Sequence, residues 1–131
     1  MRVWVRWVLR RIFVLNRYFR FIGDVQDRLP GAGFEEVGRS GWGHNDILAK
    51  RDERWWGFIC RPGELSAISV RDIGANLMAA MTAEPGFGYH VHILVCDQRQ
   101  VNSAHQAAKA GRMRIVVLDR GFEQAMREIA P

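Results

Sequence analysis

Cysteine is scarce in this sequence, and its placement excludes two classes of small protein. Only Cys60 and Cys96 occur among 131 residues, and each lies inside an apolar run. Two such distant cysteines provide neither the framework of a disulfide-rich secreted domain nor the paired spacing of a zinc site. We therefore expect reduced, buried thiols in a cytoplasmic protein. At this length the chain allows one compact domain rather than two.

The sequence also lacks the motifs of several enzyme classes. No GxxxxGK[ST] phosphate loop occurs, and the GAG at 31–33 precedes a predicted strand, whereas a dinucleotide fingerprint follows one. Neither Ser40 nor Ser103 has the context of a nucleophile elbow. We therefore expect no nucleotide cofactor and no covalent serine catalyst.

Acidic residues are absent from residues 1–22, which contain six arginines, whereas residues 23–131 are nearly neutral, with thirteen basic and fourteen acidic residues. At 100° per residue, five of the six share one arc of an amphipathic helix: Arg2, Arg6, Arg10, Arg17 and Arg20. Central arginines cost roughly 2.5 to 3.5 kcal/mol each in a bilayer, so this helix is expected not to span one. The same helix could instead lie on a membrane surface. We divide the chain into a basic N-terminal interaction segment, 1–22, and a domain, 23–131.

Hydrophobic periodicity predicts alternating strands and helices after this segment. The first helix can continue to Leu29, because Pro30 and Gly31 then end it. The strands and helices expected beyond it are, in order, strands at 34–37, 46–50 and 55–60, a helix at 70–81, a strand at 90–96, a helix at 102–111, a strand at 114–119 and a helix at 122–129. This order predicts an α/β three-layer sandwich, in which helices flank a mixed five-stranded sheet on both faces.

These elements and the residues at their turns resemble the Mrr-type restriction endonucleases of the PD-(D/E)xK nuclease superfamily. The similarity extends from about residue 19 to residue 129, through GFEEVGRSGWGHNDILAKRDERWWGFICRP, VRDIGANLMAAM, HILVCDQRQVNSAHQAA and RIVVLDR. It implies a restriction-endonuclease-like fold. In active members, an Asp at the start of the second strand and a Glu or Gln two residues before a Lys on the third organise Mg²⁺ and water. Mg²⁺ prefers oxygen ligands and polarises the phosphodiester.

Carried over to this sequence, the motif keeps only its first residue. Asp46 stands at the Asp position, but Ile59 stands at the Glu or Gln position and Arg61 at the Lys position. Residues two apart on a strand share a face, so positions 59 and 61 are expected to face the same way. Isoleucine has no oxygen for a metal, and arginine stays protonated and cannot act as a base. The resemblance therefore implies the fold with a degenerate catalytic site.

Two other acids could replace the missing ligand. Glu64 follows the third strand and Asp72 lies on the next helix, and either could bring a relocated carboxylate towards Asp46. The simpler interpretations are a solvated loop residue for Glu64 and, for Asp72, a first-turn acid stabilised by the helix dipole. Asp46 itself could equally accept hydrogen bonds within its own loop.

Three functional hypotheses follow. The first is a restriction-endonuclease-like binding module that contacts DNA or a nucleic-acid-associated protein without cutting and without a cofactor. Its expected residues are Asp46, Arg61 and the arginine arc, with Arg99 and Gln100 as further contacts. The second is a Mg²⁺-dependent DNA endonuclease with relocated ligands. The third is a scaffold subunit whose basic helix docks to a protein assembly or a membrane surface, and a homodimer is compatible with each. These hypotheses place the protein in the cytoplasm, either free or peripheral to a membrane.

Overall fold

A five-stranded mixed sheet forms the centre of the molecule, with its strands in sequence order. The computed structural model describes residues 3–41, 44–83 and 91–130. The first three strands form an antiparallel meander, and the last two continue the sheet parallel to the third. The strands are β1 (Glu35–Arg39), β2 (Ile47–Arg51), β3 (Arg54–Cys60), β4 (Val91–Cys96) and β5 (Met113–Val117). The mixed sheet predicted from the order of elements is confirmed.

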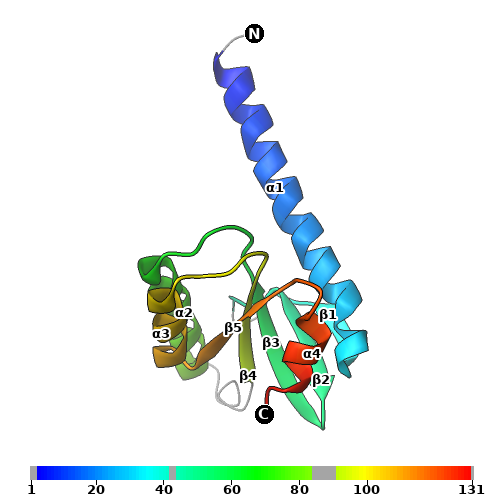
Figure 1. Ribbon diagram of the computed structural model, residues 1–131. Coiled ribbons are helices and arrows are strands. Elements are labelled where there is room, and N and C mark those ends of the chain that lie inside the picture. The colour runs from blue at the N-terminus through cyan, green and yellow to red at the C-terminus, as the bar shows by residue number, and fades with distance from the viewer. Residues whose placement is uncertain (1–2, 42–43, 84–90, 131) are drawn as a thin grey trace.

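Helices cover both faces of this sheet, as Figure 1 shows. One face carries α1 (Val3–Arg28), the short 3-10 helix η1 (Pro30–Ala32) and α4 (Phe122–Arg127). The other carries α2 (Ala67–Ala83) and α3 (Asn102–Ala110). The predicted α/β arrangement of three layers is therefore confirmed.

Helix α2 begins three residues before its predicted start because a serine caps it. The Ser66 hydroxyl oxygen accepts a hydrogen bond from the backbone N–H of Ser69 at 3.1 Å. This contact satisfies one of the N–H groups that the first turn of a helix leaves without a partner. The prediction began the helix at Val70, where the apolar spacing starts, and therefore missed this polar first turn.

The core consists of two hydrophobic clusters, one on each face of the sheet. Phe58 and Cys60 of β3 belong to the cluster under α1 and α4, whereas Ile59 belongs to the cluster under α2 and α3. All five residues from Trp56 to Cys60 are buried, because both faces of this central strand are covered. The continuous apolar run WWGFIC is typical of such a strand.

Gly57 is the point of closest packing on β3, and we expect Gly57→Ala to lower the free energy of unfolding by about 2 kcal/mol. An added Cβ would lie 2.3 Å from Oδ1 of Asn45, a residue that is 1% exposed, so one of the two side chains would have to shift within the core. Gly38→Ala on β1 is the matched control, since its Cβ would meet no atom within 4 Å. Urea denaturation measures both variants, and equal stability of the two would contradict this account of Gly57.

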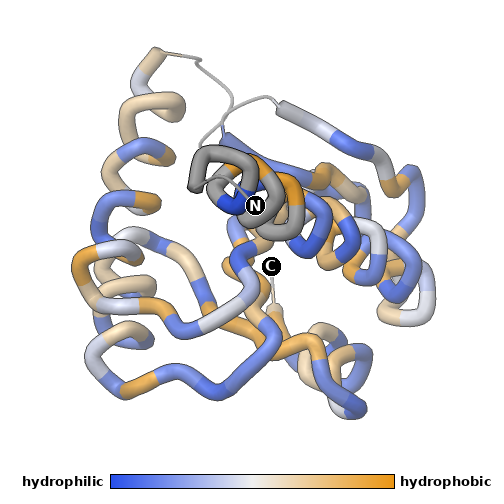
Figure 2. Tube along the Cα trace, turned by 90° about the horizontal axis from the view of Figure 1, so that it is seen from above, coloured by the Kyte–Doolittle hydropathy of each residue, from blue (hydrophilic) through white to orange (hydrophobic). Residues whose placement is uncertain are grey.

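Helix α1 passes without a break through the boundary predicted at residues 22 and 23. Its last turns belong to the domain core, in which Phe21, Ile22 and Val25 are buried. Its N-terminal turns extend beyond the rest of the molecule (Figure 1). Viewed from above in Figure 2, hydrophilic residues recur among hydrophobic ones along α1. No helix in the described part of the chain combines the length and apolar character that crossing a bilayer needs.

Candidate site at the Asp46 junction

The candidate site lies at the edge of the sheet where β2 begins and β3 ends. Asp46 immediately precedes β2, and Arg61 immediately follows β3. Because β2 and β3 are antiparallel, these two positions meet at the same edge, beside which α1 passes with Tyr18. We call Tyr18, Asp46, Cys60 and Arg61 the Asp46 junction.

Both oxygens of the Asp46 carboxylate accept hydrogen bonds inside the junction. Oδ1 accepts one from the Tyr18 hydroxyl. Oδ2 accepts one from the backbone N–H of Cys60 at 2.8 Å and one from Nη1 of Arg61 at 3.0 Å. The side chain of Asp46 is only 14% exposed, so these contacts replace much of its hydration. The carboxylate thereby joins α1, β2 and β3.

Arg61 occupies the space next to this carboxylate. Its Nη1 also donates to the backbone carbonyl of Cys60 at 2.8 Å and contacts the Tyr18 hydroxyl oxygen at 3.3 Å. Its guanidinium lies 5.5 Å from the centroid of the Tyr18 ring. A cation that the protein itself supplies therefore already contacts the Asp46 carboxylate.

The pKa shifts at the junction favour a structural role for its residues over a role in acid–base catalysis. Burial, then the hydrogen bond to Asp46 and its negative charge, raise the pKa of Tyr18 to about 12, while Arg61 opposes this shift. Tyr18 therefore stays protonated near neutral pH and donates a hydrogen bond to Asp46. Burial also raises the pKa of the Cys60 thiol well above its usual range, so little reactive thiolate forms.

Comparisons with known protein families, curated proteins and solved structures give no match.

The structure corrects the expectation that positions 59 and 61 face the same way. Ile59 is fully buried in the cluster under α2 and α3, whereas Arg61 turns towards Tyr18 on α1. The alternation of faces holds only within a strand, and β3 ends at Cys60. The residue of β3 nearest Asp46 on the α1 face is thus Cys60, which donates its backbone N–H.

The residues present do not fit a Mg²⁺ centre at Asp46. Mg²⁺ needs oxygen ligands that are free to bind it, and both Asp46 oxygens already accept bonds from protein donors. Glu64 and Asp72, the proposed relocated acids, are exposed, and no contact joins either one to Asp46 in the described residues. Across the same residues, no three His, Cys, Asp or Glu side chains are grouped to hold a metal.

Hydrogen bonds join the loops after β3 and β4 beside the junction. Gln100 accepts a hydrogen bond from the Leu65 N–H at 2.7 Å and donates to the Gly63 carbonyl at 3.0 Å. Asp97 accepts from the Gly63 N–H at 2.8 Å and forms an ion pair with Arg17 at 3.0 Å. We expected Gln100 to contact a partner, but its amide forms hydrogen bonds to the backbone of the loop after β3. Sequence reasoning missed Asp97, although an acid at a strand end opposite an arginine-rich helix is a usable signal.

The expected binding arginines fall into three groups. Arg6, Arg20 and Arg99 are exposed and pair with no carboxylate of the residues that the structure describes. Arg17 is exposed and pairs with Asp97. Arg2 and the side chain of Arg10 lie outside the described part of the chain.

We expect the Tyr18 phenol to titrate near pH 12, far above an ordinary tyrosine. Since its pKa is about 10 in the unfolded chain, the folded state keeps this proton between pH 10 and 12, and stability falls as pH rises through that window. Ultraviolet absorbance of tyrosinate in a Tyr89→Phe background reports Tyr18 alone, because the sequence has two tyrosines. Adding Asp46→Asn should lower this pKa, and an unchanged titration would show that Asp46 does not hold the phenol.

Proposed function

We propose that this chain is a restriction-endonuclease-like module that binds nucleic acid without cleaving it. Three features support the fold assignment: a helix before a three-stranded antiparallel meander, two further strands parallel to β3, and an aspartate at the start of β2. These are the features that the resemblance to Mrr-type restriction endonucleases leads us to expect.

The observation that carries the non-cleaving part of the proposal is the occupied Asp46 carboxylate. Arg61 neutralises it at 3.0 Å, and Tyr18 and the Cys60 N–H complete its hydrogen bonds. Metal-assisted hydrolysis needs a bound ion that activates water and polarises the phosphodiester. A Mg²⁺ ion would have to displace Arg61 and Tyr18 before Asp46 could bind it.

The nucleic-acid part rests on exposed arginines around the same edge of the molecule. Arg6 and Arg20 extend along α1, and Arg99 lies in the loop after β4. Arginine binds phosphate through a planar set of donors and keeps its charge at every physiological pH. Contacts of this kind position a protein on a nucleic-acid backbone without reading its sequence.

Salt-dependent binding tests this proposal. Fluorescence anisotropy of the full chain with labelled duplex DNA should show an affinity that falls steeply as salt rises, because phosphate contacts release counterions. The pair Arg6→Gln and Arg20→Gln should reduce the slope of log affinity against log salt by about 2. Arg71→Gln, an exposed arginine on α2, is the matched control. An equal loss in the control, or no binding at low salt, would overturn the proposal.

A second candidate function, docking on an anionic membrane surface, is favoured by one further feature of α1. Val8, Ile12, Leu15 and Phe19 are between 38% and 54% exposed. At 100° per residue they lie within about 60° of one another, on the side nearly opposite the arginine arc. An apolar stripe opposite arginines is typical of helices that lie in a membrane interface. The six arginines and absent acids of 1–22 disfavour pairing with a second, equally charged copy.

Vesicle sedimentation separates this candidate from the first. Docking predicts that the full chain binds vesicles containing phosphatidylserine more than neutral ones, and that Ile12→Ser with Leu15→Ser abolishes binding while leaving DNA affinity unchanged. If neither vesicle binds the chain, this candidate fails. If the two serine substitutions instead weaken DNA binding, the apolar stripe belongs to the nucleic-acid surface.

A further inference from the structure

A second cationic site lies at the opposite edge of the sheet from Asp46, where β4 and β5 begin. A cavity of about 740 Å³ opens there between the starts of the two strands and the end of α3. Its floor includes the apolar residues Val91, Met113 and Ile115 and the buried His92, and its rim includes four exposed residues with basic side chains: His105, Lys109, Arg112 and Arg114. We call it the basic cavity.

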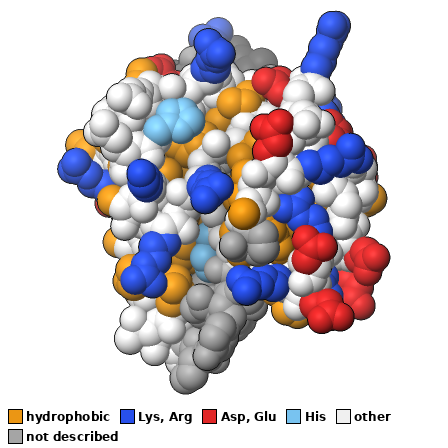
Figure 3. Space-filling model, turned by 60° about the horizontal axis from the view of Figure 1, so that its bottom comes forward, with side chains coloured by type: hydrophobic (Ala, Val, Ile, Leu, Met, Phe, Trp, Pro, Cys, Tyr) orange, Lys and Arg blue, Asp and Glu red, His pale blue; other side chains and the backbone are white. Residues whose placement is uncertain are grey.

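The described residues that line the basic cavity carry an excess of positive charge. Among the residues that the structure describes, this lining contains no acidic side chain, and Lys109, Arg112 and Arg114 form no ion pair. In Figure 3, which brings the bottom of the molecule forward, Lys and Arg side chains surround hydrophobic surface near two histidine patches, while Asp and Glu side chains gather to one side. Several exposed cations around one cavity attract an anion, and the apolar part of the lining offers contact to the group that carries it.

The backbone at Arg112 indicates that the position of this cation matters. Arg112 has φ of 60°, in the left-handed region that glycine adopts at least cost, although Gly111 stands next to it with φ of −88°. Gly111 is needed in its own place, since an added Cβ would lie 3.3 Å from the Cα of Gly74 on α2. The chain thus keeps an arginine in a left-handed position at the cavity rim, and backbone strain of this kind gathers at functional sites.

We propose that the basic cavity binds a phosphate ester of about nucleotide size. Lys109, Arg112 and Arg114 hold the phosphate oxygens, and His105, one turn before Lys109 on α3, lies beside them. The nucleoside part packs on Val91 and Ile115, the partly exposed apolar side chains of the lining. A volume of about 740 Å³ is within the usual range of small-molecule sites. The phosphate comes either from a free nucleotide or from a nucleic-acid end.

Isothermal titration of the full chain tests the site with three probes: inorganic phosphate, adenosine 5′-monophosphate and a short 5′-phosphorylated oligonucleotide. We expect Arg114→Gln to weaken binding at least about tenfold, as the loss of a charge-assisted contact does. Arg71→Gln on α2 should leave binding unchanged. Binding of the monophosphate identifies a nucleotide site, whereas binding of the oligonucleotide alone identifies a nucleic-acid end.

Arg112→Gly separates binding from folding. Glycine suits the left-handed backbone, so this variant should keep or raise the melting temperature while it weakens phosphate binding. Asp46→Asn should leave affinity at the basic cavity unchanged, which distinguishes failure of this site from failure of the function proposed for the Asp46 edge. The inference is overturned if none of the three probes binds, or if Arg114→Gln and Arg71→Gln bind alike.

Discussion

Asp46→Ala is expected to lower the free energy of unfolding by about 3 kcal/mol. The substitution removes an acceptor that joins three elements, and it leaves the Cys60 N–H and the Arg61 guanidinium without their carboxylate. The cost should be smaller for Asp46→Asn, because asparagine keeps one acceptor oxygen and the shape of the side chain. Chemical denaturation followed by circular dichroism measures the series.

An exposed ion pair on the same helix provides the control for Asp46. Arg17→Gln breaks the contact between α1 and Asp97, in which the arginine side chain is 56% exposed. Solvent-exposed pairs contribute only about 0 to 1 kcal/mol, so this variant should differ little from the parent chain. If Asp46→Ala cost no more than Arg17→Gln, the junction would not hold α1 against the sheet.

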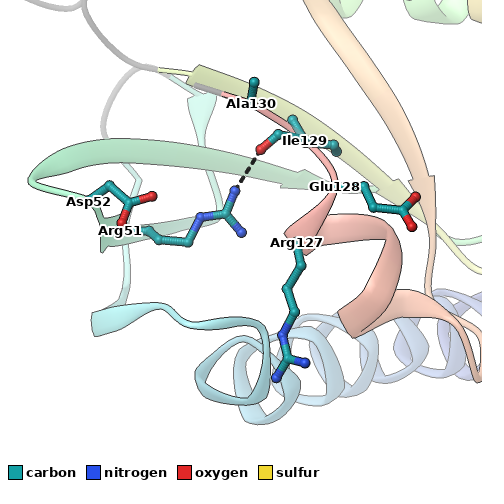
Figure 4. A pocket seen from close by; sticks show the side chains of 6 residues that line it. All are labelled: Arg51, Asp52, Arg127, Glu128, Ile129 and Ala130. Atoms are coloured by element: carbon teal, nitrogen blue, oxygen red, sulfur yellow. Dashed lines mark hydrogen bonds between the residues drawn. The ribbon is translucent and has the colours of Figure 1, made fainter.

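Arg51→Met is expected to destabilise the protein by about 3 kcal/mol, although Arg51 takes no part in the proposed functions. Figure 4 shows its guanidinium directed towards the end of α4. It donates to the backbone carbonyls of Met126 and Ile129, both at 2.9 Å. The same group lies 4.6 Å from the ring centroid of Phe34 and 4.3 Å from that of Trp56. Methionine fills the space between the rings but leaves the carbonyls without a donor.

Arg51→Lys distinguishes charge from geometry. Lysine keeps the positive charge but has no planar fork with which to reach two carbonyls at once, so we expect an intermediate loss. Amide hydrogen exchange should show faster opening at the end of α4 in both variants. Equal stability of Arg51→Lys and the parent chain would mean that only the charge between Phe34 and Trp56 matters.

The sequence predicts the order of elements well because periodicity reports burial. WWGFIC and HILVC are continuous apolar runs, and they form the two adjacent strands β3 and β4 that helices cover on both faces. Boundaries are less accurate where polar contacts decide them. Ser66 starts α2 through a local cap, and the strand predicted at 34–37 runs instead from Glu35 to Arg39.

The site was predictable only in part, for a geometric reason. The resemblance brings Asp46 and Arg61 to one edge, and the structure places them 3.0 Å apart. It does not reveal Tyr18, because this contact joins residues 28 positions apart through the docking of α1. It also assigns Ile59 to the wrong face, since the strand ends before Arg61 and the alternation of side chains ends with it.

The central claim is that Asp46 supports no metal-dependent DNA cleavage, because protein donors already occupy its carboxylate. The most direct measurement is incubation of the full chain with supercoiled plasmid and Mg²⁺, next to Asp46→Asn as a variant of the same shape. The account predicts intact plasmid in both reactions, even at low salt, where we expect the protein to bind DNA. Nicking that requires Mg²⁺ and disappears in Asp46→Asn would contradict it.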